Sequence, residues 1–274
     1  MCVVLIMKNE IELKPSYFAS VSGGKDSLLM LKIILENPDK YPLDGVVHAE
    51  LEIDFPFIKN VADYMEKECK KRGIPFFRIK PRVTWKELYN LYGFPSKVYR
   101  WCNSKYKLDA FRQLEEFMNG KGYKVIYYIG YCVNEVTRYD KRKNPNEIYP
   151  LVLENIVESD VLKWAQSVPL FNNYYITQKR CGCMYCPMQS FICLAYVFKY
   201  YPSEYENIMK MARETEKMVY IKTGKPTSVW QGNPKYNTDY VDNIVRTKWL
   251  KKLEEKENEY YDNFRNPKES KSNQ

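Results

Sequence analysis

The sequence predicts an α/β protein with an open, mainly parallel sheet, helices on both faces, and a helical C-terminal region that carries a cysteine cluster. Three observations lead to this fold class. In the first half, extended apolar segments alternate with helical segments, which is typical of parallel strands joined by helices. A glycine turn connects the first strand to its helix. After about residue 150 the strand pattern ends, and helices with closely spaced cysteines follow.

The first core strand is predicted at 17–21, where the apolar run is nearly continuous. Such a run is expected of a parallel strand buried on both faces. Its helix, at 26–36, ends at Asn37-Pro38 because the residue before a proline disfavours helical backbone. Further strands are predicted at 43–51, 75–79 and 125–131, and further helices at 56–72, 85–92 and 102–119.

The second half is predicted to be helical. Helices are expected at 158–164, 190–201, 205–222 and 241–263, with a loop over 224–242 and a polar tail at the end. Glu158-Ser159-Asp160 supplies the acidic and capping residues of a helix start. We therefore expect this region to pack as helices against the α/β half.

The turn Ser22-Gly23-Gly24-Lys25-Asp26-Ser27 is the most informative segment of the chain. Its glycines let the backbone approach an anion closely, and the helix that follows points N–H groups and a positive dipole end at it. The serine hydroxyls and the Lys25 ammonium are further donors to phosphate oxygens. The spacing differs from the Walker pattern G-x-x-x-x-G-K-[ST]. The turn therefore predicts a phosphate site at the carboxyl end of the first strand.

Composition narrows the function classes. The formal net charge of +9 and the 25 tyrosines favour anionic partners, with nucleotides, RNA and DNA as candidates. The single histidine, His48, argues against a Ser-His-Asp triad or a multi-histidine metal site, and we expect it to be a core residue. The apolar runs are short and mean hydropathy is −0.55, so no membrane span is expected. The amino end lacks the features of a signal peptide, which favours a cytoplasmic location.

Eight cysteines occur, and three of them form Cys181-Gly182-Cys183-Met184-Tyr185-Cys186. Without a secretory signal, this tight spacing favours a metal site over disulfides. A fourth ligand must come from elsewhere, and Cys102 is the candidate. A [4Fe-4S] cluster, zinc and free redox thiols all remain open. The expected metal ligands are Cys102, Cys181, Cys183 and Cys186.

Together these segments resemble the phosphoadenosine phosphosulfate (PAPS) reductase-like branch of the ATP-pyrophosphatase, or PP-loop, superfamily, over about residues 16–190. The resemblance implies an adenine nucleotide alpha hydrolase-like fold. It also implies a PP-loop nucleotide-binding domain at 1–150 and a helical region at 151–274. The matching segments are 22–27, 48–57, 100–107, 130–138 and 149–164.

Two departures from that family pattern matter. Cys132 stands where the loop G-x-R-x-x-E-S-x-R has its first arginine, and Thr137 stands where it has serine. The chain also lacks the C-terminal E-C-G-x-H segment of thioredoxin-linked PAPS reductases, since its one histidine is His48. The cysteine cluster looks more like the iron–sulfur relatives that transfer sulfur.

The resemblance implies an ATP-dependent, adenylating sulfur transferase that releases pyrophosphate, uses Mg²⁺, and acts on a nucleic acid or small-molecule acceptor. A sulfonucleotide (PAPS or APS) reductase is one alternative. A non-catalytic nucleotide- or nucleic-acid-binding protein, using a basic C-terminal helix, is the other. A sulfur- or electron-donor protein and a second copy of the chain are candidate partners.

By the same resemblance, Lys25, Asp26 and Arg138 are the expected catalytic residues. The expected nucleotide-binding residues are Ser20, Ser22, Gly23, Gly24, Lys25, Asp26, Ser27, Glu50, Arg100, Lys105, Gly130 and Glu135.

Overall fold

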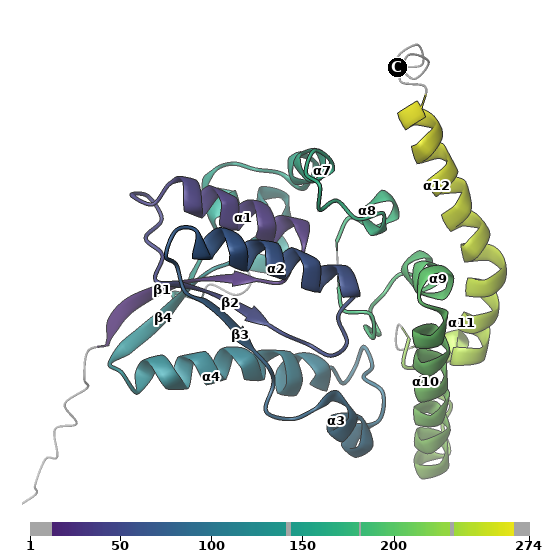
Figure 1. Ribbon diagram of the computed structural model, residues 1–274. Helices are drawn as coiled ribbons and strands as arrows, with labels where there is room; N and C mark the ends of the chain where they lie inside the picture. Colours follow the sequence, from purple (N-terminus) through teal and green to yellow (C-terminus); the bar gives the residue numbers. More distant parts are fainter. Residues whose placement is uncertain (1–12, 141–143, 181, 231–232, 266–274) are drawn as a thin grey trace, which may run out of the picture.

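The computed structural model describes residues 13–140, 144–180, 182–230 and 233–265, and its centre is a five-stranded parallel sheet (Figure 1). The strand order is β3-β2-β1-β4-β5, with every neighbouring pair parallel. The predicted open parallel sheet is therefore confirmed. The strands are β1 (Lys14–Val21), β2 (Gly45–Ala49), β3 (Phe76–Ile79), β4 (Tyr123–Tyr128) and β5 (Glu147–Ile148).

Helices cover both faces of the sheet (Figure 1). On one face lie α1 (Lys25–Glu36) and α2 (Pro56–Lys70), and on the other lies α4 (Leu108–Asn119). Alternate β1 residues face opposite ways, so Ala19 joins the core under α1 and α2, whereas Phe18 joins the core with α4. The helix predicted over 102–119 begins as a π-helical segment, Cys102–Lys107.

The strand register brings the candidate site to one edge of the sheet. Val21 lies opposite His48 of β2, and Ala19 lies opposite Tyr128 of β4. Because parallel strands end on the same side, the segments that follow β1, β2 and β4 meet at their carboxyl ends. His48 is 3% exposed, and its Nδ1 lies 3.0 Å from the Val21 carbonyl oxygen, as expected of a core histidine.

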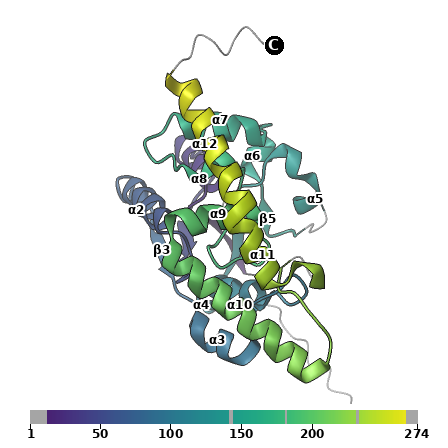
Figure 2. The same ribbon diagram turned by 90° about the vertical axis from the view of Figure 1, so that its right-hand side faces the viewer.

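The C-terminal region is helical, as predicted, and α12 crosses it along α8 and α9 (Figure 2). One boundary differs from the sequence prediction. The loop predicted to continue to residue 242 ends at Asn237, whose side chain accepts a hydrogen bond from the Tyr240 N–H and so caps a helix. The main helices are α7 (Glu158–Gln166), α9 (Phe191–Tyr200), α10 (Pro202–Thr223), α11 (Thr238–Ile244) and α12 (Leu250–Arg265). Shorter segments are α3 (Trp85–Tyr92), α5 (Val136–Tyr139), α6 (Pro150–Leu153) and α8 (Tyr174–Thr177).

The helical region shares a hydrophobic core with the α/β half. Phe55 and Phe57, at the start of α2, lie 5.1 Å and 5.8 Å from the Tyr174 ring of α8. This core continues through Trp101 to Leu253 of α12. The two halves are therefore joined by aromatic packing, and the division at residue 150 stays a prediction. Within the described residues, no helix is long and apolar enough to cross a membrane.

Candidate active site

The glycine turn forms as predicted between β1 and α1, and Gly23 is the residue that makes it possible. Its φ is +74°, a region that side-chain-bearing residues rarely adopt. A Cβ atom there would lie 2.7 Å from Cγ2 of Ile58 and 3.0 Å from its carbonyl oxygen. The turn thus needs glycine both for its backbone conformation and for its close approach to α2.

The two serines of the turn brace it internally. The Ser22 N–H donates to Ser27 Oγ at 3.2 Å, and Ser27 Oγ donates to the Gly24 carbonyl at 2.9 Å. Gly24 is the N-cap of α1 and supplies no side-chain cap. The first turn of α1 therefore starts without a capping side chain of its own, which leaves the helix end suited to an external anion.

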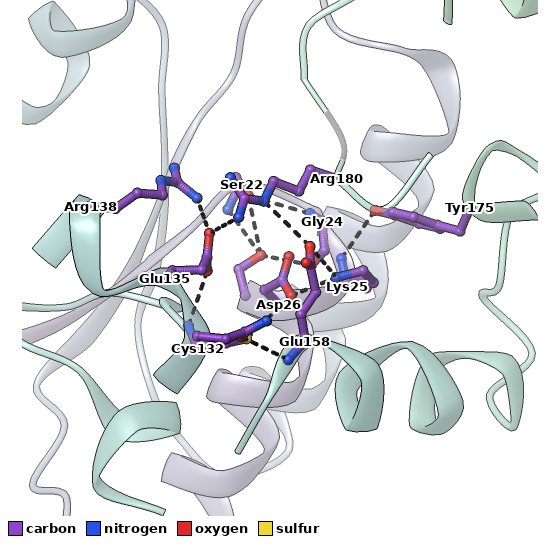
Figure 3. Close-up of polar contacts among 12 residues, drawn as sticks. Ser22, Gly24, Lys25, Asp26, Cys132, Glu135, Arg138, Glu158, Tyr175 and Arg180 are labelled. Carbon is purple, nitrogen blue, oxygen red and sulfur yellow. Dashed lines mark hydrogen bonds and ion pairs between the residues drawn. The ribbon is translucent and has the colours of Figure 1, made fainter. Parts of the chain in front are cut away.

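Lys25 lies beneath this turn between two carboxylates (Figure 3). Its side chain is 1% exposed, and its Nζ is 2.7 Å from Asp26 and 3.8 Å from Glu158 of α7. An ammonium buried this deeply is stable only with close anionic partners. The ion pairs fix Lys25 at the start of α1, beside the amide groups of the turn.

A second group of charged side chains lies beside Asp26, with Glu135 at its centre (Figure 3). Glu135 is 4% exposed and forms ion pairs with Arg138 at 2.5 Å and Arg180 at 2.9 Å. Arg180 also lies 3.3 Å from Glu158. The loop after β4 and the segment before the cysteine cluster thus converge on one network, so two predicted residues, Glu135 and Arg138, reach the turn.

Two of the three carboxyls of this network, Asp26 and Glu135, differ in acidity. Burial raises the pKa of Asp26 above its ordinary value, with Lys25 opposing the rise and Glu135 adding to it. Burial acts in the same direction on Glu135, but the Cys132 N–H and the Arg138 guanidinium outweigh it and lower its pKa. Asp26 is therefore the carboxyl that holds a proton more readily, and a bound cation would favour its ionised form.

Cys132, which stands where the family pattern has arginine, lies against Asp26. Its Sγ is 3.8 Å from Asp26 Oδ1, and its side chain is fully buried. Burial, with the Asp26 charge beside it, raises the pKa of Cys132 to about 12. The residue is therefore a neutral thiol, and the cations of this site come instead from Lys25, Arg138 and Arg180.

Tyr175 of α8 contacts the turn directly (Figure 3). The Lys25 N–H, at the start of α1, donates to the Tyr175 hydroxyl oxygen at 3.1 Å. The ring packs near Phe57 and Phe171, at centroid distances of 6.4 Å and 6.1 Å, and is 7% exposed. The hydroxyl therefore holds an amide that a phosphate oxygen would use.

Replacing Tyr175 with phenylalanine is expected to tighten ATP binding by up to about tenfold. A phosphate oxygen would no longer have to displace a hydroxyl that is worth about 0.5–1.5 kcal/mol as a hydrogen-bond partner. Isothermal titration of Tyr175→Phe with ATP would measure the change. Tyr174→Phe is the matched control, because the neighbouring hydroxyl lies 3.0 Å from Cys193 Sγ, away from the turn. Weaker ATP binding by Tyr175→Phe would show instead that the hydroxyl contacts the nucleotide.

Other predicted nucleotide-binding residues fall into two groups. Ser20, near the end of β1, and Glu50, after β2, are half-buried at the carboxyl edge. Gly130 packs closely on the helix start, since a Cβ atom there would lie 3.1 Å from the Asp26 carbonyl oxygen. Arg100 and Lys105 are exposed; the positive charge of Arg100 acts on Cys102 and Cys186, and Lys105 lies 5.5 Å from the Tyr92 ring centroid.

The cysteine cluster forms a second site. The Cys183 thiol donates a hydrogen bond to the Cys186 sulfur, which lowers the pKa of Cys186. Burial raises the pKa of Cys102 to about 11, and the nearby Cys186 adds to the rise. Three of the four predicted ligands are thus neighbours, and Cys181 lies outside the described residues. Soft thiols with Arg100 beside them suit a thiolate-bound metal chemically. Within the described residues, however, no group of three metal-binding side chains is placed to hold an ion.

Sequence reasoning missed three residues of the site: Glu158, Tyr175 and Arg180. Glu158 carries only a helix-start signal, and Tyr175 is one of 25 tyrosines. Arg180 directly precedes the cysteine cluster, and no motif distinguishes it from other surface cations. Their roles arise because the helical region folds back over the turn.

Residues 16–125 match the family described as the phosphoadenosine phosphosulfate reductase domain. With its parallel sheet and its glycine turn in place, this part of the chain is similar to that domain family in both sequence and fold. The resemblance predicted from the motifs is thereby confirmed for this part of the chain.

Relatives match over different parts of the chain. Two uncharacterized proteins of Methanocaldococcus jannaschii are 29% identical over 61% of this chain and 26% identical over 76% of it. A tRNA(Ile)-lysidine synthase of Caldanaerobacter subterraneus is 33% identical over 28% of this chain and 17% of its own length. The chain spans 40% and 44% of the two Methanocaldococcus relatives, less than half of each.

Among solved structures, the chain matches the U34-tRNA thiolase NcsA from Methanococcus maripaludis, solved with its [4Fe-4S] cluster. The TM-score is 0.39 at 18% identity, over 76% of this chain and 73% of that one.

Proposed function

We propose that this chain binds ATP at the Ser22–Ser27 turn and transfers its adenylyl group to an oxygen of an acceptor, which then exchanges that oxygen for sulfur. The observation that carries the proposal is the buried Lys25 held between Asp26 and Glu158, at a helix start whose N-cap residue, Gly24, supplies no capping side chain. A phosphate chain placed there would meet backbone amides and a fixed positive charge.

The chain's own residues suit an adenylyl transfer. The acceptor oxygen would attack the α-phosphorus, the bond to pyrophosphate would break, and the acceptor would carry AMP as a leaving group. A sulfide ion would then displace AMP, so that a carbon–sulfur bond forms as the carbon–oxygen bond to AMP breaks. The turn amides and Lys25 would stabilise the departing pyrophosphate, and Arg138, whose guanidinium Glu135 orients, would face the α-phosphate. Asp26 is the carboxylate that would bind Mg²⁺.

The cysteines would hold the sulfur-handling group. Cys102, Cys183 and Cys186 would be three ligands of an iron–sulfur cluster or zinc, with Cys181, which lies outside the described residues, as the fourth. An iron–sulfur cluster would supply iron that binds an external sulfide, whereas zinc would make the site structural. Colour, iron, sulfide and zinc content of anaerobically purified protein distinguish the two, and Cys183→Ala should lose the bound metal.

The basic C-terminal helix gives little support to the non-catalytic alternative. Arg246 Nε donates to Asp242 at 2.6 Å, and its guanidinium lies 4.7 Å from the Phe198 ring centroid. This cation is therefore part of the packing between helices. A residue held in that way contributes little to a phosphate-binding surface.

Pyrophosphate release tests the proposal against the reductase alternative. We expect the protein to release pyrophosphate from ATP when Mg²⁺, sulfide and an acceptor fraction are present. The acceptor fraction is either an unfractionated tRNA pool or a small-molecule extract. Sulfite release from PAPS, together with no pyrophosphate release from ATP with any acceptor fraction, would overturn the proposal and identify a sulfonucleotide reductase.

A further inference from the structure

Residues 174–180, which we call the strap, contact the glycine turn and its charges at both ends. At one end, the Lys25 N–H donates to the Tyr175 hydroxyl oxygen at 3.1 Å. At the other end, Arg180 forms ion pairs at 2.9 Å and 3.3 Å with the two glutamates of the charge network. Figure 3 shows both side chains pointing toward the residues of the turn. The strap therefore engages groups that a polyphosphate would also use.

Both contacts are ones for which a bound polyphosphate would compete. Phosphate oxygens accept hydrogen bonds from the amides of a helix start, so they compete with the Tyr175 hydroxyl for the Lys25 N–H. They also bind guanidinium groups through paired hydrogen bonds, so they compete with the carboxylates for Arg180. Each carboxylate partner of Arg180 keeps another cation, Arg138 or Lys25. Arg180, whose side chain is 51% exposed, can therefore change partner without leaving either carboxylate unpaired.

The strap is also tied to residues 182–190, which we call the cysteine loop. Ser190 Oγ donates to Gln178 Oε1 of the strap at 3.0 Å. The neighbouring Gln189 donates from its Nε2 to the carbonyl oxygens of Cys183 and of the residue after it, at 2.8 Å and 2.7 Å. A strap that leaves the turn therefore disturbs the hydrogen bonds that shape the backbone at Cys183.

We propose that a polyphosphate bound at the turn releases the strap and loosens the cysteine loop, so that nucleotide binding and the arrangement of the thiols are coupled. The inference rests on the proposed function for the position of ATP. Such coupling is reciprocal, so whatever holds the cysteine loop in its closed arrangement weakens ATP binding by the same factor. The consequence is an order of events, in which the thiols become accessible to sulfide only after ATP is bound.

Hydrogen–deuterium exchange of the wild-type protein, followed by mass spectrometry, tests this coupling. Amides of the cysteine loop are protected by hydrogen bonds, including those of Met184 to the Ile53 carbonyl and of Gln189 to the Cys186 carbonyl. We expect saturating ATP with Mg²⁺ to speed exchange in this loop by at least about fivefold, the lower end of typical coupling between sites. Adenosine, which has no phosphate, should leave exchange unchanged. Helix α4, on the opposite face of the sheet from α1, is the internal reference (Figure 1).

Three variants separate the steps of the coupling. Arg180→Gln should exchange rapidly in the cysteine loop without ATP, and ATP should add little. Arg82→Gln is the matched control and should behave like the wild type, because Arg82 is 49% exposed and also pairs with two carboxylates, both in α4. Gln178→Met lacks the acceptor for Ser190, so ATP should still speed exchange in the strap but no longer in the cysteine loop.

Calorimetry with ATP on the same samples distinguishes failure of the coupling from failure of the proposed function. Unchanged exchange in the cysteine loop of wild-type protein saturated with ATP overturns the coupling and leaves the proposed function intact. Slow exchange in Arg180→Gln without ATP also overturns it, because the ion pairs would then not hold the strap. ATP-dependent exchange without pyrophosphate release contradicts only the proposed function, and absent ATP binding overturns both.

Discussion

Replacing Lys25 with methionine is expected to reduce pyrophosphate release by at least about 100-fold, the loss typical of removing one fixed electrostatic contact from a transition state. The same change should lower the free energy of unfolding by about 3 kcal/mol. The Lys25 side chain is 1% exposed between Asp26 and Glu158, and removing it leaves two carboxylates without their shared partner. A pyrophosphate assay and urea unfolding measure the two effects.

Lys32→Met is the matched control for that experiment. Lys32 belongs to the same helix, but its side chain is 45% exposed and its ion pair with Glu36 lies on the surface. Such pairs contribute little to stability, so neither measurement should change appreciably. Full pyrophosphate release by a folded Lys25→Met protein would contradict the role assigned to the ammonium.

Replacing Gly23 with alanine is expected to abolish detectable ATP binding and to lower the free energy of unfolding by about 2–4 kcal/mol. The backbone part is about 1 kcal/mol, because alanine is disfavoured at a φ of +74°. Overpacking adds about 1–3 kcal/mol, since the new Cβ would lie 2.7 Å from Ile58 Cγ2. Relief of that contact requires the turn to move, and the amides that would face a bound phosphate move with it. Calorimetry with ATP and thermal unfolding measure both effects.

Gly122→Ala separates the two contributions. Gly122 also has a positive φ, +84°, but nothing lies within 4 Å of the Cβ position. It should therefore show the backbone cost alone, with unchanged ATP affinity. Equal effects of the two substitutions on stability, with ATP binding retained in both, would show that the approach to Ile58 does not shape the turn.

Local patterns carried most of the information about the α/β half. The continuous apolar run before Ser22 and the helical run after it fixed the order of strand, turn and helix, because both depend on neighbouring residues. The single histidine could likewise be placed in the core from its apolar strand. The start of α11 was predicted too late, since Asn237 acts as a cap only when its side chain turns toward the Tyr240 N–H.

Residues of the site that come from distant parts of the chain were harder to predict from the sequence. Arg100 and Lys105 were expected near the nucleotide because they belong to the family-like segment 100–107. In the fold, the Arg100 charge acts on the cysteines, and Lys105 lies over Tyr92. Tyr175 and Arg180 were missed because a single tyrosine or arginine carries no local signal. Each reaches the turn only through the packing of α8 and the segment after it.

By itself, the sequence determined the parallel sheet, the glycine turn after the first strand and the closeness of Cys183 to Cys186, since these follow from apolar periodicity, glycine conformation and close spacing. Only the tertiary structure decided which charges surround the turn. Lys25 meets Glu158 and Tyr175 more than 130 residues away because the helical region shares one aromatic core with the sheet, and that core positions side chains that no local pattern links.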